Sequence, residues 1–285
     1  MKCSAKDAFM AEIPPYNSGP SFPLQAASMC PRPGRFRRFI MAVVAAALLL
    51  ARPAAAAEIR VLCSNGFRAV MKDLVPQFER STSNHVEVTY GLSAELARRV
   101  RAGELFDVAI LTPALIDELM REGTLATASS VNLARSAIAL AIRQGSSKPD
   151  VRDLDGVRRT LLAAPTIAYA REGASAEFFL TLVGRLGLSE QLKTKIVASA
   201  SGAAVASSVA AGDVALGVMP VSEILPVAGA EVGATFPADL AGYITMTAAI
   251  GARARQPAAA ADLLRYLTAD AAAAALKRRG MDSVR

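Results

Sequence analysis

The first half of the chain alternates between short apolar runs and stretches whose apolar residues recur at helical spacing. The short runs predict strands, and the stretches between them predict amphipathic helices. Strands are expected at 58–63, 85–90 and 107–111, and helices at 67–78 and 94–102. Pro76 lies inside the first helical stretch, where we expect it to kink or end the helix. The order β-α-β-α-β is typical of a parallel sheet flanked by helices.

The second half repeats this alternation. Strands are expected at 136–142, 165–170, 195–200, 213–219 and 242–252, and helices at 175–186, 202–211 and in the C-terminal stretch. The C-terminal stretch, "AAAADLLRYLTADAAAAALKRRG", is interpreted as one or two helices because alanine has the highest helix propensity. From residue 58 onwards the chain is long enough for one large domain or two modest ones.

Residues 35–57 have the three parts of a secretory signal peptide. A basic segment, RFRR, precedes an apolar run of about a dozen residues, and small residues follow. A membrane-spanning helix is the alternative, but it needs about 20 apolar residues and this run ends at Arg52. We therefore expect residues 1–57 to be an N-terminal extension with a signal peptide that is cleaved before Glu58. The mature protein is then expected in the periplasm.

Removal of this leader changes the charge balance. The full chain has a formal net charge of +7, whereas residues 58–285 carry 25 Lys and Arg against 23 Asp and Glu. These basic residues are scattered over helical stretches without interleaved aromatic residues, so nucleic acid is not expected as a partner. Cys63 is the one cysteine from residue 58 onwards, so we expect no internal disulfide despite export.

Four turns that follow a predicted strand and open a predicted helix are built from small or hydroxyl residues. They are Ser64-Asn65-Gly66, Gly91-Leu92-Ser93, Gly173-Ala174-Ser175 and Ser201-Gly202. In α/β sheets, ligands bind beyond the carboxyl ends of the strands, where helix N-termini offer backbone N–H groups to an anion. Taken alone, each turn is better explained by helix capping. Four such turns in two similar halves leave capping and a shared ligand cleft as open alternatives.

Catalytic and metal sites lack candidate residues in the sequence. The single histidine, His85, lies in a polar loop before a strand, where a solvated role is expected. Cys63 is interpreted as a small buried hydrophobic residue, because one neighbouring cation alone is available to activate its thiol. Asp107, Asp213 and Glu223 are separated carboxylates, interpreted as capping or solvated groups, and no cluster has metal-ligand spacing. We therefore expect no enzyme activity, no metal site and no cofactor.

Five segments have an order and composition that point to a known family. They are "IRVLCSNGFRAVMKDLVPQFE", "GLSAELARRVRAGELFDVAIL", "TIAYAREGASAEFF", "GDVALGVMPVSEILPVAGAEVGATFPADL" and "LLRYLTADAAAAALKRRGM". With them the chain resembles the molybdate-binding proteins of ABC importers, within the type II periplasmic solute-binding proteins. The resemblance implies two α/β lobes, each a mainly parallel sheet flanked by helices, with crossover strands as a hinge. Lobe 1 is expected to span 58–135 and 240–285, and lobe 2 to span 136–239.

The resemblance also implies that a small oxyanion is bound between the lobes by neutral hydrogen-bond donors. In the first lobe, Ser93 keeps the hydroxyl of the family's second ligand-binding serine. Gly66 aligns with the first serine and lacks the hydroxyl, so a backbone N–H remains there unless Ser64 or Asn65 supplies a replacement.

In the second lobe, Ser175 and Gly202 align with positions that donate backbone N–H groups. Pro220 aligns with the family's ligand-binding tyrosine and has neither a hydroxyl nor an N–H group. The ligand-binding residues expected from both lobes are Ser64, Asn65, Gly66, Ser93, Ser175 and Gly202.

The sequence thus predicts a periplasmic substrate-binding protein of an ABC importer that captures a small, molybdate- or tungstate-like oxyanion in an interlobe cleft. The departures at Gly66 and Pro220 leave a small organic carboxylate as an alternative ligand. A secreted sensor module, or an enzyme on the same fold, is a further alternative. The expected partners are the anionic ligand and the importer permease, and the protein is expected to be a monomer.

Export with cleavage is a first testable prediction. Intact mass spectrometry of the protein recovered from the periplasm should give a chain that starts near Glu58. Recovery of a mass that still includes residues 1–57 would contradict it.

Overall fold

The computed structural model describes residues 56–284, which belong to the compact unit Ala55–Arg285. The predicted signal peptide lies outside these residues, so its cleavage stays a prediction. Among the described residues, none of the helices has the length and apolar character needed to cross a membrane.

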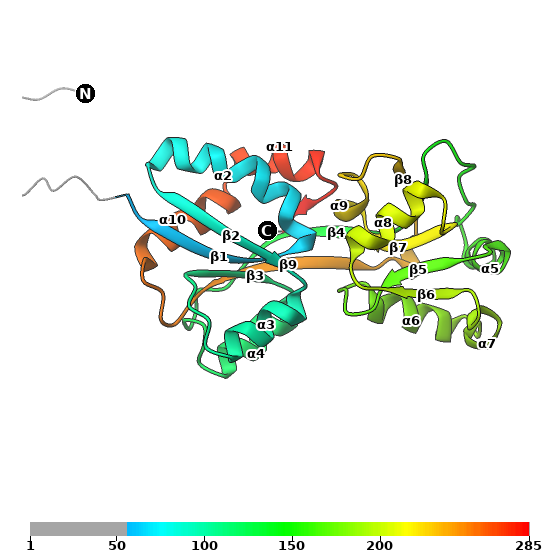
Figure 1. The fold of residues 1–285 in the computed structure, drawn as a ribbon, viewed down its shortest axis with the longest axis horizontal. Coiled ribbons are helices and arrows are strands. Elements are labelled where there is room, and N and C mark those ends of the chain that lie inside the picture. Colours follow the sequence, from blue (N-terminus) through cyan, green and yellow to red (C-terminus); the bar gives the residue numbers. More distant parts are fainter. Residues whose placement is uncertain (1–55, 285) are drawn as a thin grey trace, which may run out of the picture. The chain divides into compact units, whose positions relative to one another are not determined.

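The strands of the described residues form one continuous sheet in two halves (Figure 1). The first half has the order β2-β1-β3-β9-β4 and the second has the order β4-β7-β5-β6, so β4 belongs to both. The strands are β1 (Glu58–Ser64), β2 (His85–Gly91), β3 (Val108–Leu111), β4 (Val131–Arg143), β5 (Ile167–Ala170), β6 (Ile196–Ser199), β7 (Leu216–Pro220), β8 (Ala230–Thr235), β9 (Tyr243–Ile250) and β10 (Asp282–Ser283). Strands β8 and β10 pair with β4 outside this order.

Helices flank both halves of the sheet. The helices of the first half are η1 (Asn65–Phe67), α2 (Arg68–Thr82), α3 (Ser93–Arg101), α4 (Pro113–Arg121), α10 (Pro257–Thr268) and α11 (Asp270–Arg278). Those of the second half are α5 (Leu154–Ala163), α6 (Ala176–Arg185), α7 (Ser189–Leu192), α8 (Gly202–Ala211), α9 (Val221–Ile224) and η2 (Ala238–Leu240).

Successive side chains of a strand point to opposite faces of the sheet, and this alternation divides the core of the first half into two layers. In β1, Val61 and Cys63 pack into the cluster that contains the apolar face of α2, whereas Leu62 packs into the cluster of α3 and α4. In β3, Ile110 and Leu111 divide in the same way. Because both faces are covered by helices, β3 is buried at every position, as a strand inside a parallel sheet should be.

The second half is built by the same rule. Alanine side chains of β4 pack into the core cluster that contains residues of α8. Larger side chains of β4, such as Leu140, pack into the cluster that contains residues of α5 and α6. Strand β5 pairs in parallel with β6 and with β7. The carboxyl ends of β5, β6 and β7 therefore meet at one edge of this sheet, and the turns into α6, α8 and α9 begin there.

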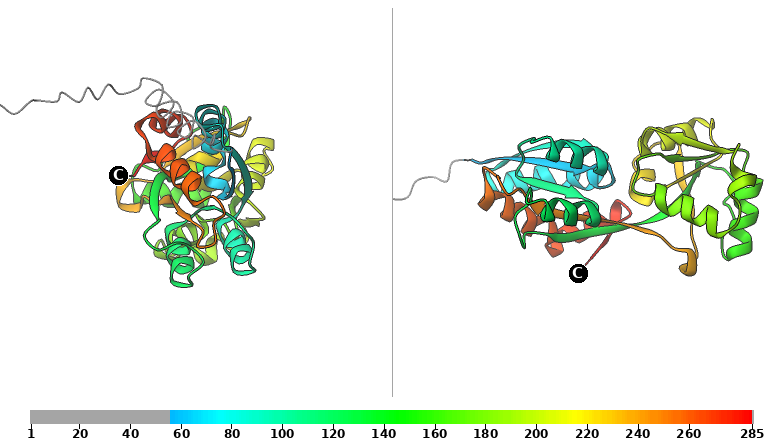
Figure 2. Two further views of the ribbon diagram at one scale, coloured as in Figure 1. Left: turned by 90° about the vertical axis from the view of Figure 1, so that its left-hand side faces the viewer. Right: turned by 90° about the horizontal axis from the view of Figure 1, so that it is seen from below.

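Two strands, β4 and β9, run between the halves (Figure 2). They pair with each other in antiparallel fashion from Val131 to Ala137, with an irregularity between Asn132 and Ala134. Beyond Ala137, β4 continues into the second half and pairs with β7 and β8. The predicted fold class, two mainly parallel α/β lobes joined by crossover strands, is confirmed. We call the two halves the first and second lobe, and the residue boundaries proposed for them stay a prediction.

Most predicted elements are present. Pro76 was expected to kink or end the helix, and α2 does not end there but continues to Thr82. Proline removes one i→i−4 hydrogen bond, but Pro76 and the preceding turn at Lys72 lie on the exposed side of the helix, where water can solvate the freed carbonyl. Buried side chains on both sides of Pro76, such as Leu74 and Phe78, hold the helix to the core. The sequence pattern also missed α4, α5, α7, α9 and β8.

Asp107 is a buried carboxylate that ties three elements of the first lobe together. Its Oδ2 accepts a hydrogen bond from the backbone N–H of Arg60 in β1, and its Oδ1 accepts one from Gln256 at the start of α10, both at 2.9 Å. The side chain is almost fully buried, and it immediately precedes β3. Asp107 thus links the backbone of β1 to the start of α10, which differs from the capping or solvated role expected for it.

Substitution of Asp107 tests this account of the core. Asp107→Ala leaves two backbone donors without their acceptor and should lower the free energy of unfolding by about 2 to 4 kcal/mol. Asp107→Asn keeps one acceptor oxygen and should cost less. Urea unfolding followed by circular dichroism measures both. Asp117→Ala, at an exposed carboxylate on α4, is the matched control and should stay within about 0.5 kcal/mol of the wild type.

Candidate functional site

The turns chosen from the sequence converge on one cavity between the two lobes. Its lining includes residues of the first lobe, residues of the second lobe and the side chains of two methionines. The residues are Ser64, Asn65, Leu92, Ser93, Ala170, Gly173, Ala174, Ser175, Gly202, Met219, Pro220, Glu223 and Met246. Five of the six expected ligand-binding residues are among them. Gly66 is buried beside the cavity but does not line it.

In the first lobe, two hydroxyl groups face each other at the ends of adjacent parallel strands. The Ser93 hydroxyl donates a hydrogen bond to Ser64 Oγ at 2.9 Å, and both residues are buried. Ser93 begins α3, whose N-cap residue is Leu92, and within the described residues its hydroxyl bonds to Ser64 and not to its own helix. Capping therefore does not explain Ser93, and the proton of Ser64 remains available to a group in the cavity.

In the second lobe, the two turns differ. Ser201 caps α8, because its Oγ accepts a hydrogen bond from the N–H of Ala204, so capping does explain this hydroxyl. Ser175 makes no side-chain capping bond, and its hydroxyl makes a long contact of 3.5 Å with the carbonyl of Val218. The N-terminus of α8, which starts at Gly202, is directed at the cavity and brings a partial positive charge there.

Glu223 corrects the expectation of an uncharged site. We interpreted this residue as a capping or solvated group, but its carboxylate lies in the cavity, between Gly66 of the first lobe and Gly202 of the second. A Cβ atom at Gly202 would overlap Glu223 Oε2, and one at Gly66 would lie 3.5 Å from Oε1. The carboxylate thus fills the space that a side chain at Gly202 would occupy and lies at contact distance from Gly66.

The environment of Glu223 changes its acidity. Desolvation on burial raises the pKa of Glu223 to about 7, and the positive charge of Arg68 opposes this shift. Within the described residues, its carboxylate takes part in no ion pair and accepts no hydrogen bond. Near neutral pH the group therefore exchanges a proton readily, and it can donate or accept a hydrogen bond.

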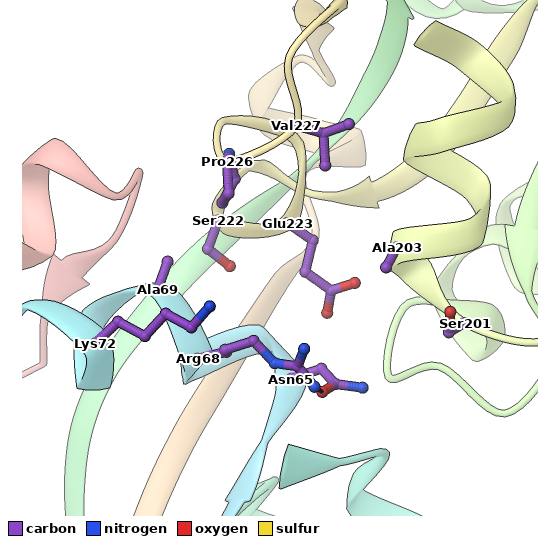
Figure 3. A pocket seen from close by; sticks show the side chains of 10 residues that line it. All are labelled: Asn65, Arg68, Ala69, Lys72, Ser201, Ala203, Ser222, Glu223, Pro226 and Val227. Atoms are coloured by element: carbon purple, nitrogen blue, oxygen red, sulfur yellow. Dashed lines mark hydrogen bonds between the residues drawn. The ribbon is translucent and has the colours of Figure 1, made fainter. Parts of the chain in front are cut away.

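A second, larger cavity adjoins the first and shares Asn65 and Glu223 with it (Figure 3). The inner cavity has a volume of about 20 Å³, enough for one water molecule, whereas the outer one has about 330 Å³. Arg68 and Lys72 of α2 extend into the outer cavity from the first lobe, and Glu223 enters it from α9 (Figure 3). The two cavities together bring cations, hydroxyls and one carboxyl group into a common space.

Two features of the outer cavity leave polar groups ready for a ligand. Arg68 is held in place because it donates to Asn65 Oδ1 at 2.6 Å and stacks 4.7 Å from the centroid of the Tyr90 ring. Ser222 is buried, and its Oγ is the one buried side-chain polar atom in the described part of the chain without a hydrogen-bond partner. An unpaired buried hydroxyl is costly, so a partner from the cavity would stabilise it.

The remaining candidate residues lie outside both cavities. His85 is exposed at the start of β2 and pairs with Glu79, at 2.8 Å between Nδ1 and Oε1. Asp213 is exposed, in agreement with the solvated role expected for it. Cys63 is buried, and burial raises the pKa of its thiol above the usual range. Among the described residues, no group of three or more His, Cys, Asp or Glu could hold a metal ion.

An ion pair joins the lobes at the edge of the cleft. Arg98 of α3 lies 3.1 Å from Glu172, which belongs to the turn between β5 and α6. Both side chains are exposed, so the pair stabilises this closed arrangement by a small amount. Glu172 is next to the turn that carries Ser175, so the pair links the lobes beside the inner cavity.

A family of bacterial extracellular solute-binding proteins matches residues 59–282. The chain belongs to this family. Among curated proteins, it is 28% identical over 261 residues to the aconitate isomerase of a Pseudomonas species, covering 87% of this chain and 98% of that protein. It is also 28% identical over 246 residues to the molybdate-binding protein ModA of Azotobacter vinelandii, covering 84% of this chain and 96% of that protein.

Solved structures agree with the fold. The periplasmic molybdate-binding protein of Azotobacter vinelandii matches with a TM-score of 0.67 and 21% identity, over 80% of this chain and all of that one. The sulfate-binding protein SubI of Mycobacterium tuberculosis matches with a TM-score of 0.67 and 18% identity, over 80% of this chain and 87% of that one. The chain is thus a molybdate-binding-protein-like member of the solute-binding proteins with the type II fold.

Sequence reasoning missed Glu223, Arg68, Lys72 and Ser222. Each follows a strand–turn–helix junction by a few residues, but spacing along the sequence does not show which face of a helix will meet the other lobe. One signal was present: "MPVSEI" places Ser222 and Glu223 directly after a buried strand, at the carboxyl edge where ligands bind.

The ion pair between Arg98 and Glu172 yields a prediction about lobe closure. An exposed pair contributes about 0.2 to 1 kcal/mol, so Arg98→Ala should lower the ratio of closed to open protein by at most about fivefold. Spin labels at Arg121→Cys in α4 and Arg185→Cys in α6, both exposed, report the distance between the lobes by double electron–electron resonance. Glu172→Ala should give the same distance distribution as Arg98→Ala. A distribution unchanged by either substitution would contradict the closing role.

Proposed function

We propose that this protein is the substrate-binding component of an ABC importer, located in the periplasm, and that it captures a small organic carboxylate between its lobes. The observation that carries the proposal is the convergence of the turns of both lobes on one cavity, beside the cations Arg68 and Lys72. A ligand that contacts both lobes stabilises the closed form because it binds that form more tightly than the open one. The protein would act as a monomer that delivers its ligand to the importer permease.

Three features favour a carboxylate over the molybdate-like oxyanion expected from the resemblance. Pro220 lines the inner cavity and cannot donate a hydrogen bond there. The carboxyl group of Glu223, when ionised, disfavours molybdate, which has no hydrogen to donate to it. The outer cavity extends the space to about 330 Å³ and adds two cations, which suits a ligand with a second carboxylate.

A second candidate function is an isomerase for an unsaturated carboxylate. Glu223, with a pKa of about 7, could take a proton from a carbon of the ligand and return it at the other end of the double bond. Arg68 and Lys72 would hold the carboxylates during this shift. The similarity to a protein named aconitate isomerase supports the possibility, at 28% identity. We favour the binding protein because the family is one of solute-binding proteins.

Isothermal titration calorimetry of the chain from Glu58 onwards tests the proposed function. Succinate, malate, citrate, aconitate, sulfate and molybdate are titrated in turn, and a carboxylate should bind with micromolar affinity. Ser93→Ala and Arg68→Gln should each weaken this binding by about tenfold or more, because each removes a hydrogen bond to a charged group. Ser189→Ala, at an exposed serine on α7, should leave it unchanged.

The outcomes separate the alternatives. Micromolar binding of molybdate without binding of any carboxylate would restore the oxyanion interpretation, and a failure of all six ligands would contradict the proposal. Proton NMR of aconitate with the protein in D₂O distinguishes the enzyme, because deuterium incorporation or interconversion of isomers would identify an isomerase.

A further inference from the structure

We propose that Glu223 sets the ligand specificity of the cleft, by favouring ligands that offer it a hydrogen-bond donor and disfavouring fully deprotonated tetrahedral oxyanions. A hydroxy acid, or an acid that retains one proton, provides such a donor, whereas sulfate and molybdate do not. The inference rests on the proposed binding function and names the class of ligand that the same site takes.

The position of Glu223 is built from both lobes. Its carboxylate lies between Gly66 and Gly202. A Cβ at Gly202 would overlap Oε2, whereas one at Gly66 would lie at ordinary contact distance from Oε1, 3.5 Å, and would instead meet Met246 Cε at 2.8 Å. The absence of a side chain at Gly202 therefore leaves room for this carboxyl group at the point where a ligand would touch both lobes.

The carboxyl group has no partner of its own within the described residues. It makes no hydrogen bond or ion pair there, although it lines both cavities and its enclosure raises its pKa to about 7. A carboxylate in this state gains most from a donor, and it repels a second negative charge that cannot offer one. Solvent reaches its oxygens, so a ligand that displaces this solvent has to supply the donor.

Among the residues that the structure describes, the charged side chains around Glu223 form no hydrogen bond or ion pair with its carboxylate. On α2, Arg68 and Lys72 line the outer cavity, and the charge of Arg68 favours the ionised form of Glu223. Helix α8, strand β7 and η1 contribute no ionisable side chain. On β4, Arg135 stacks on Tyr243 and Arg143 lies beside Gly212, while Glu231 of β8 is a further carboxylate that adds no positive charge.

The pH dependence of oxyanion binding is the experiment. Sulfate or molybdate can bind beside Glu223 when the carboxyl group is protonated and donates to the oxyanion, so binding takes up a proton. With a pKa of about 7, the dissociation constant of the wild-type protein for sulfate should rise about fiftyfold from pH 7 to pH 9. Malate, whose hydroxyl can donate to the ionised carboxylate, should lose less than about threefold over the same range.

Glu223→Gln converts the group into a permanent donor of similar shape. In this variant the affinity for sulfate and molybdate should become independent of pH and should exceed that of the wild type about tenfold at pH 8. Glu190→Gln makes the same chemical change at an exposed residue of α7, outside both cavities, and should keep the wild-type profile. Circular dichroism and urea midpoints establish that the variants fold.

A measurement on the wild-type protein alone supports the comparison. Calorimetry of sulfate binding at pH 8 in Tris and in imidazole, two cationic buffers with different ionisation enthalpies, should show uptake of about one proton per sulfate. Equal pH profiles for the wild type and Glu223→Gln, or no gain of oxyanion binding in the variant, would overturn the inference while carboxylate binding persists. If neither protein binds any of the anions, the proposed function fails together with the inference.

Discussion

The antiparallel pairing of β4 with β9 is the constraint on which the rest of the structure depends. Both strands leave the sheet of the first lobe, and β4 goes on to pair with β7 and β8, so hydrogen bonds run without interruption from one lobe to the other. Each lobe keeps its own parallel strands, whose carboxyl ends lead into helices next to the crossing. The cleft and its lining residues follow from this connection, because the turns of both lobes are brought to the same place.

Much of this arrangement could be predicted from the sequence, and there are physical reasons why the remaining elements could not. Strands such as β1 and β3 were predicted because their apolar pattern is dictated by burial on two faces, and Ser64, Ser93, Ser175 and Gly202 were found because strand–turn–helix junctions have a recognisable composition. Whether Pro76 would end its helix could not be predicted, because its effect depends on whether water reaches the freed carbonyl. Helix α9 was missed because four residues, Val221–Ile224, are too short to show periodicity.

Glu223 illustrates why the chemistry of a cleft is harder to predict than its location. The residue type and the nearby strand end were visible in the sequence, but its enclosure depends on Gly202, about twenty residues earlier, and on Gly66 in the other lobe. A glycine ahead of a helix is equally well explained by local backbone needs. Here its lack of a side chain makes room for a carboxyl group from another element, which is a property of three-dimensional packing.

The cations Arg68 and Lys72 both belong to α2 of the first lobe, whereas the carboxyl group of Glu223 belongs to the second. An anion that approaches an open cleft is therefore attracted by one wall and, above neutral pH, repelled by the other. Its first encounter is with α2, and the association rate falls as salt screens the two cations. In the proposed function, contact with Glu223 follows as the lobes close, so the first lobe would govern capture and the second would govern residence time.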